Sequence, residues 1–168
     1  MNALSLQKVS WKQKKKSAEL WFSDKLIATI SFGLKKTTVQ FTDHRWEIRG
    51  KGFWWPQVVI KEKSKVLLTQ KNIGFWGVKN EVLVDNRIYT ATTKQATLYN
   101  VSYTNAGGGA VVSYALTAAK RKAAVNFTIN AGDTPEQDVL LLFVLGYYTM
   151  RAVILENNAA TDGVSATR

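Results

Sequence analysis

Residues 133–156 read DTPEQDVLLLFVLGYYTMRAVILE, and this stretch decides the fold. Thr134 can cap a helix, Pro135 suits its first position, and Gln137 completes a capping box. The acidic residues around this start complement the positive end of a helix. The sequence therefore predicts a helix over residues 135–156.

The predicted helix is apolar on every side. Only Thr149 and Arg151 interrupt the apolar character of residues 139–155. Such a helix must be surrounded by protein or by lipid. The unbroken run, residues 139–148, falls short of the roughly 20 residues that span a membrane, and a charge such as Arg151 near the centre would cost about 2.5–3.5 kcal/mol. We favour burial in protein; a C-terminal membrane anchor is the alternative.

Upstream of this helix, polar and apolar residues alternate in short runs rich in Val, Ile, Thr and aromatic residues. Runs of this kind, about ten residues apart and separated by turn residues, are typical of antiparallel strands in a barrel or sandwich. The runs are Leu4–Trp11, Ala18–Phe22, Leu26–Phe32, Thr38–Phe41, Arg45–Ile48, Gln57–Lys61, Val66–Gln70, Ile73–Val78, Glu81–Val84, Arg87–Thr92, Thr97–Tyr103, Val111–Thr117 and Ala123–Asn130.

The strands and the helix complement each other. A barrel of about twelve strands is too wide for its own side chains to fill, and a helix from Glu136 to Glu156 would be about 31 Å long, enough to traverse it. We therefore expect a mainly β protein, an antiparallel barrel of about twelve strands enclosing a hydrophobic C-terminal helix. The 168 residues would form one domain, with strands over about 4–130, the helix over about 135–156 and a flexible tail over 157–168.

About twelve antiparallel strands followed by one hydrophobic helix at residues 138–156 resembles the tubby C-terminal-like superfamily. This superfamily includes the tubby-like proteins, the phospholipid scramblases and the LURP-one-related proteins, and the resemblance covers residues 4–156. It implies a barrel threaded by its last helix, and phosphoinositide binding through basic side chains on neighbouring strands. The scramblase feature of palmitoylation is not supported, because the chain has no cysteine.

The residues that most enzymes use are scarce. With no cysteine and one histidine, His44, the chain offers no disulfide, thiolate nucleophile or Cys-ligated metal site. Asp43 and His44 would point to opposite faces of a strand, so we interpret His44 as a solvated turn residue. No Gly-x-Ser-x-Gly motif is present. We expect a protein that is not an enzyme and needs no metal or cofactor.

The net charge of +11 is unevenly distributed along the chain. Residues 1–71 hold fifteen Lys and Arg against five Asp and Glu, whereas residues 72–168 hold eight against seven. An electropositive face attracts polyanions. One cluster of lysines, at residues 12–16, lies near Trp11 and Trp21 in the sequence. In a second cluster, at residues 61–65, lysines alternate with other residues around a predicted turn. The candidate anion-binding residues are Lys12, Lys14, Lys15, Lys16, Lys61, Lys63 and Lys65.

Basic loops bordered by Trp suit the surface of an anionic membrane, and they also suit nucleic acid or serve only solubility. We expect a non-enzymatic binding or scaffold protein that binds anionic membrane lipid peripherally through its basic face. A basic single-stranded nucleic-acid-binding protein is the alternative. No apolar run of 7–15 residues follows a basic start, which favours the cytoplasm. The aromatic clusters at residues 52–56 and 74–77 serve core packing or a contact site.

Overall fold

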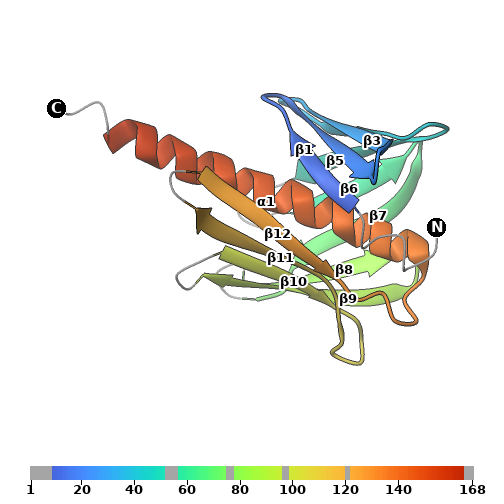
Figure 1. The fold of residues 1–168 in the computed structure, drawn as a ribbon. Coiled ribbons are helices and arrows are strands. Elements are labelled where there is room, and N and C mark those ends of the chain that lie inside the picture. Colours follow the sequence, from blue (N-terminus) through green and yellow to red (C-terminus); the bar gives the residue numbers. More distant parts are fainter. Residues whose placement is uncertain (1–8, 52–56, 75–77, 96–98, 120–121, 165–168) are drawn as a thin grey trace. The chain divides into compact units, whose positions relative to one another are not determined.

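The computed structural model describes residues 9–51, 57–74, 78–95, 99–119 and 122–164. It contains twelve strands and one helix, and each strand pairs with its neighbours in chain order (Figure 1). The strands are β1 (Val9–Gln13), β2 (Ser17–Phe22), β3 (Lys25–Phe32), β4 (Thr37–Gln40), β5 (Arg45–Lys51), β6 (Gln57–Glu62), β7 (Lys65–Asn72), β8 (Lys79–Val84), β9 (Arg87–Gln95), β10 (Tyr99–Thr104), β11 (Ala110–Ala119) and β12 (Lys122–Ile129). The helix is α1 (Glu136–Val164).

The prediction of a mainly β protein with about twelve antiparallel strands and a C-terminal helix is confirmed. The strand order runs from β1 to β12, and within the described residues no hydrogen-bonded ladder joins these two strands. Closure of the sheet into a barrel therefore stays a prediction. No helix of the described chain combines the length and the apolar character that crossing a membrane requires.

The chain divides into two compact units, residues 1–90 and 91–168, with the boundary inside β9. Unit 1 has a core made by period-2 alternation. Ala18, Ile30, Val39 and Trp46 lie opposite one another on β2 to β5, and each is at most 2% exposed. The residues between them along each strand face outward, which places polar and charged side chains together on the outer face.

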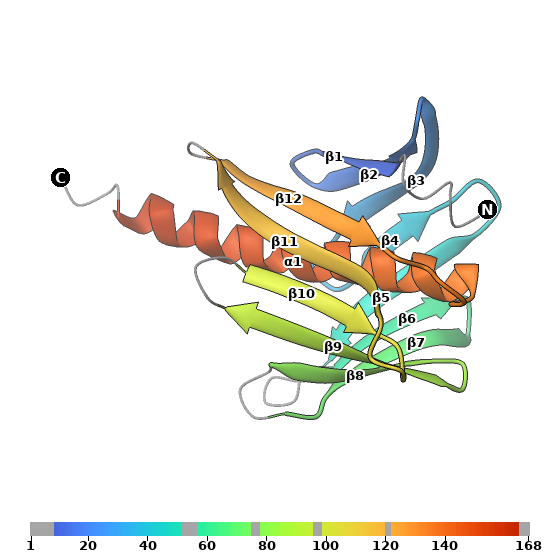
Figure 2. The same ribbon diagram turned by 60° about the horizontal axis from the view of Figure 1, so that its bottom comes forward.

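Unit 2 is organised by α1, which packs mainly on β11 and also contacts β10 and β12 (Figure 2). Gly146 allows the close approach: a Cβ there would lie 2.3 Å from Cε2 of Tyr114 on β11. The Tyr114 hydroxyl donates a hydrogen bond of 2.7 Å to the Phe143 carbonyl oxygen. The Phe143 ring also meets Phe127 of β12 edge-on, with centroids 4.9 Å apart.

The helix is longer than predicted. It begins at Glu136, with the Val139 amide bonded to the Pro135 carbonyl oxygen at 3.1 Å, and it continues to Val164, beyond the predicted end at residue 156. The sequence beyond Glu156 is no longer apolar, but it contains Ala159 and Ala160 and no proline over 157–164.

Two strand predictions also need correction. Of the predicted strand Ile73–Val78, the described residues Ile73, Gly74 and Val78 are not in a strand, because the chain turns at Gly74, whose amide bonds to Oδ1 of Asn72 at 2.9 Å. Residues 75–77 lie outside the described residues. The first strand extends to Gln13, so Lys12 lies within β1 and not in the following loop. The predicted start at Leu4 falls outside the described residues.

Gly146→Ala tests the packing of α1 on β11. Overpacking costs about 1–3 kcal/mol, against about 1 kcal/mol gained from the helix propensity of alanine. We expect the free energy of unfolding to fall by up to about 2 kcal/mol, as measured by urea denaturation.

The matched control is Gly107→Ala, where a Cβ would meet only Oδ1 of Asn105, at 3.4 Å. It should change the free energy of unfolding by less than about 0.5 kcal/mol. Adding Tyr114→Ala should remove most of the penalty at Gly146, because the clashing ring is gone. Equal effects of the two glycine substitutions would contradict this packing.

Candidate functional site

Three of the candidate lysines form a tight turn between β1 and β2. Lys14, Lys15 and Lys16 are exposed, and the Lys14 amide donates a hydrogen bond of 2.8 Å to the Ser17 carbonyl oxygen. Lys12 lies just before them on β1, with its Nζ 4.1 Å from the ring centroid of Trp21. This is a cation–π contact on the outer face of the sheet.

A second lysine turn joins β3 to β4 and consists of Gly33, Leu34, Lys35 and Lys36. The Gly33 amide donates to the Lys36 carbonyl oxygen at 3.1 Å. A Cβ at residue 33 would lie 2.7 Å from that same oxygen, so the tightness of the turn requires glycine. Lys35 and Lys36 are both exposed.

The two lysine turns are neighbours at one end of unit 1. Turns alternate between the two ends of an antiparallel sheet, so the first and third turns share an end. The Phe32 amide donates a hydrogen bond of 3.0 Å to the Lys16 carbonyl oxygen, which holds the turns side by side. We define the basic end as these five lysines and one leucine: Lys14, Lys15, Lys16, Leu34, Lys35 and Lys36.

Two lysines of the basic end form ion pairs with carboxylates. Lys14 forms an ion pair with Glu19 of β2, and Lys36 pairs with Glu47 of β5 at 2.7 Å. The hydrogen bond from Lys14, followed by one from Trp21, lowers the pKa of the Glu19 carboxyl. The hydrogen bonds from Lys36 and Arg49 lower the pKa of Glu47. Lysines outnumber these carboxylates, so the basic end carries net positive charge.

Leu34 stands at the tip of the second turn and is fully exposed, at 109% of its reference surface. The other exposed large apolar residues of the described chain lie between 42% and 53%. Its backbone is held outward by the Gly33–Lys36 hydrogen bond, and lysines follow it directly in the sequence. Leu34 could not be identified from the sequence, because an isolated leucine in a turn carries no periodic signal.

Two of the other candidate lysines lie elsewhere. Lys63 is in the turn between β6 and β7, and Lys65 is the first residue of β7. This turn is the sixth of the sheet and is at the opposite end of the strands from the basic end. Lys61 lies on β6 opposite Glu47 of β5. This register places Lys61 beside the carboxylate that pairs with Lys36 of the basic end. The structure therefore separates Lys63 and Lys65 from the other candidate lysines, and Lys35 and Lys36 join the first cluster.

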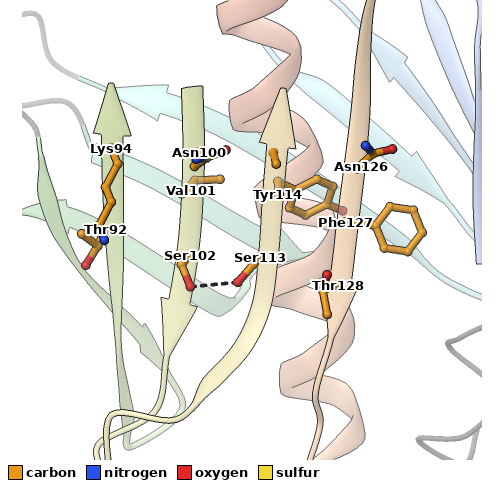
Figure 3. Close-up of a pocket in the computed structure, with 11 residues that line it drawn as sticks. Thr92, Lys94, Asn100, Val101, Ser102, Ser113, Tyr114, Asn126, Phe127 and Thr128 are labelled. Atoms are coloured by element: carbon orange, nitrogen blue, oxygen red, sulfur yellow. Dashed lines mark hydrogen bonds between the residues drawn. The ribbon is translucent and has the colours of Figure 1, made fainter. Parts of the chain in front are cut away.

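Unit 2 has a groove of about 350 Å³ on the face of β9–β12 opposite α1 (Figure 3). Short polar side chains from paired positions form its floor, and Ser102 and Ser113 are joined by a hydrogen bond of 2.9 Å. The two rows are Ser102, Ser113 and Thr128, and Asn100, Ala115 and Asn126. Thr92 and Lys94 of β9 complete its edge.

The groove offers hydrogen-bonding groups and a single cation, Lys94, but neither a carboxylate nor a histidine among the residues that line it. The residues that line the groove therefore do not include a carboxylate or histidine pair that could act as general acid and general base. Its sequence signal is the i, i+2 spacing of small polar residues on three successive strands, which also describes an ordinary solvated sheet face. The groove therefore offers fewer charged side chains to a charged partner than the basic end does.

The remaining candidates from the sequence are His44, possible metal ligands and the two aromatic clusters. His44 is exposed in the turn after β4 and stacks on Phe41, with centroids 4.3 Å apart. Within the described residues, no group of three His, Asp or Glu side chains could hold a metal ion. The aromatic residues at 53–55 and 75–76 lie outside the described part of the chain.

The chain matches no protein-family model, no curated protein and no solved structure. The resemblance to the tubby C-terminal-like superfamily therefore stays a prediction.

The Glu19 carboxyl should titrate below its ordinary pKa of 4.5. A carboxyl with a lowered folded-state pKa contributes stability above its unfolded-state pKa, and that contribution is lost as the pH falls through the folded-state value. Lys14→Met should raise the Glu19 pKa towards its ordinary value, and Lys63→Met should leave it unchanged. Carboxyl-carbon NMR titration measures both; an unshifted Glu19 in the parent protein would contradict the ion pair.

Proposed function

We propose that this chain is a peripheral binder of anionic membrane surfaces that acts through the basic end. The observation that carries the proposal is the hydrogen bond from Phe32 to Lys16, which holds two lysine turns against each other. Adjacent flexible lysines can meet many headgroups at once without a shaped pocket. That suits a fluid, multivalent anionic surface better than a single small ligand.

The expected binding is weak and reversible. Each lysine near an anionic membrane contributes about 1 kcal/mol, so five lysines supply about 5 kcal/mol at most. Since Lys14 and Lys36 are already paired with carboxylates, the effective sum is smaller and corresponds to a dissociation constant on the order of a millimolar. Salt shortens the range of this attraction from about 10 Å at 0.1 M to about 3 Å at 1 M.

A membrane suits the basic end better than single-stranded nucleic acid does. Nucleic-acid binders of this kind pair a basic groove with aromatic rings on which the bases stack. The Trp21 ring, the aromatic group beside the first lysine turn, has Lys12 placed over it and its Nε1 bonded to Glu19 at 3.1 Å. A base would have to displace that lysine, so nucleic acid is the competing outcome of the test.

A triple variant, Lys15→Gln, Lys16→Gln and Lys35→Gln, tests the proposal. Cosedimentation with phosphatidylserine–phosphatidylcholine vesicles should weaken at least about tenfold, because three cations leave the contact surface. Binding by the parent should also fall steeply with salt. The melting temperature should stay nearly constant, since exposed lysines contribute little to folding.

The matched control is Lys25→Gln, Lys63→Gln and Lys65→Gln, which removes the same charge from three exposed lysines at the opposite end of the strands. It should reduce vesicle binding much less. Equal loss in both variants, or equal binding of the parent to pure phosphatidylcholine vesicles, would contradict the basic end as the site. Tighter binding of a single-stranded oligonucleotide in a gel-shift assay at the same salt would favour nucleic acid instead.

We also propose that the sheet closes into a barrel around α1. Residues 141–145 of the helix are consecutive and each at most 1% exposed. Five consecutive helical positions cover more than one full turn, so side chains on every face of this segment are shielded from water. Full burial on every face supports enclosure rather than packing on one surface.

Ending the chain before Thr134 should abolish cooperative folding, because it removes the apolar helix that packs on β10, β11 and β12. Thermal unfolding followed by circular dichroism, with size-exclusion chromatography, measures this. A truncation of 165–168, which lies beyond α1, is the control and should melt like the full chain. A soluble, cooperatively melting protein without α1 would contradict the enclosure.

A further inference from the structure

The tip of the basic end combines an apolar side chain with cations. Leu34 is fully exposed and is followed by Lys35 and Lys36, while Lys15 and Lys16 lie on the adjacent turn. A single exposed leucine is common on soluble proteins and needs no explanation by itself. Its position beside Lys35 and Lys36, on a turn whose base is bonded to the first lysine turn, is the feature that requires an explanation.

The turn geometry holds Leu34 outward. The Gly33 amide is bonded to the Lys36 carbonyl oxygen at 3.1 Å, and the missing Cβ of Gly33 lets the chain reverse this tightly. Residue 34 is therefore presented at the apex, away from the core of unit 1. Because this conformation exists before binding, little conformational entropy is lost when the leucine meets a partner.

We propose that Leu34 inserts into the acyl boundary of an anionic bilayer and anchors the basic end there. The inference rests on the proposed function, since the lysines must first bring the turn to the membrane. A lysine side chain can lay its aliphatic stem along the bilayer while its ammonium group reaches the headgroups. Lys35 and Lys36 can therefore remain with the anionic headgroups while Leu34 enters the apolar layer.

Electrostatic attraction and apolar insertion respond differently to salt. The lysine contribution weakens as salt screens it, whereas burial of a leucine side chain does not. Burial of a whole leucine side chain corresponds to about tenfold or more in the binding constant. Binding should therefore depend on two separable signals, as is usual for weak lipid anchors.

A label on residue 34 tests the insertion directly. Because the chain has no cysteine, Leu34→Cys provides a unique attachment point for a nitrobenzoxadiazole fluorophore. On addition of phosphatidylserine–phosphatidylcholine vesicles, its emission should shift to the blue and gain intensity, and lipid-borne spin labels should quench it. Leu26→Cys is the matched control, since Leu26 is a partly exposed leucine at the other end of β3; its label should not respond.

Leu34→Ser in the unlabelled protein completes the test. It should weaken binding to these vesicles about tenfold while preserving the salt dependence, and Leu26→Ser should leave binding unchanged. If the parent binds anionic vesicles but the label at residue 34 stays in water, or Leu34→Ser binds like the parent, the insertion is wrong and the proposed function stands. If the parent shows no preference for anionic vesicles, both are wrong.

Discussion

The contact between Tyr114 and α1 is the constraint on which unit 2 depends. The ring of Tyr114 occupies the space that a side chain at Gly146 would need, and its hydroxyl bonds to the backbone of the helix at Phe143. One residue thus sets both the distance of the helix from β11 and its position along the strand. The remaining contacts, such as the edge-on packing of Phe127 on Phe143, require that placement.

In unit 1 the corresponding constraint is the strict alternation of turns in an antiparallel sheet. Two lysine-rich turns lie at opposite ends of the sheet when an odd number of strands separates them along the chain. The turns at residues 14–16 and 62–65 are an example. Lysines in the first and third turns become neighbours, although eighteen residues of chain separate Lys16 from Lys35. Strand order therefore decides which charges act together.

The sequence predicted the secondary structure well because its signals are local. Alternation on β2 and β3, and the Thr-Pro start of α1, depend on neighbouring residues alone. The strand predicted from residue 73 is wrong at Ile73 and Gly74. Its composition suits a strand, whereas the Asn72 side chain accepts a hydrogen bond from the Gly74 amide in a turn. The grouping of the basic end was out of reach, because it depends on the pairing of Ser17 with Ser31 across two strands. The exposure of Leu34 depends on the turn closed by Gly33, which composition does not reveal.

The order of elements along the chain has a consequence for synthesis on the ribosome. Each strand can pair with the strand that precedes it as soon as it emerges, since every ladder joins neighbours in sequence. The apolar face of β10–β12, by contrast, has no helix to cover it until α1, the last element, has left the exit tunnel. A nascent chain in which β12 has emerged while α1 is still inside the tunnel would hold Tyr114 and Phe127 on an uncovered sheet face, a substrate for chaperones and for aggregation with its neighbours. Correct folding of the β10–β12 face therefore depends on the synthesis of residues 136–164, which form the helix that covers it.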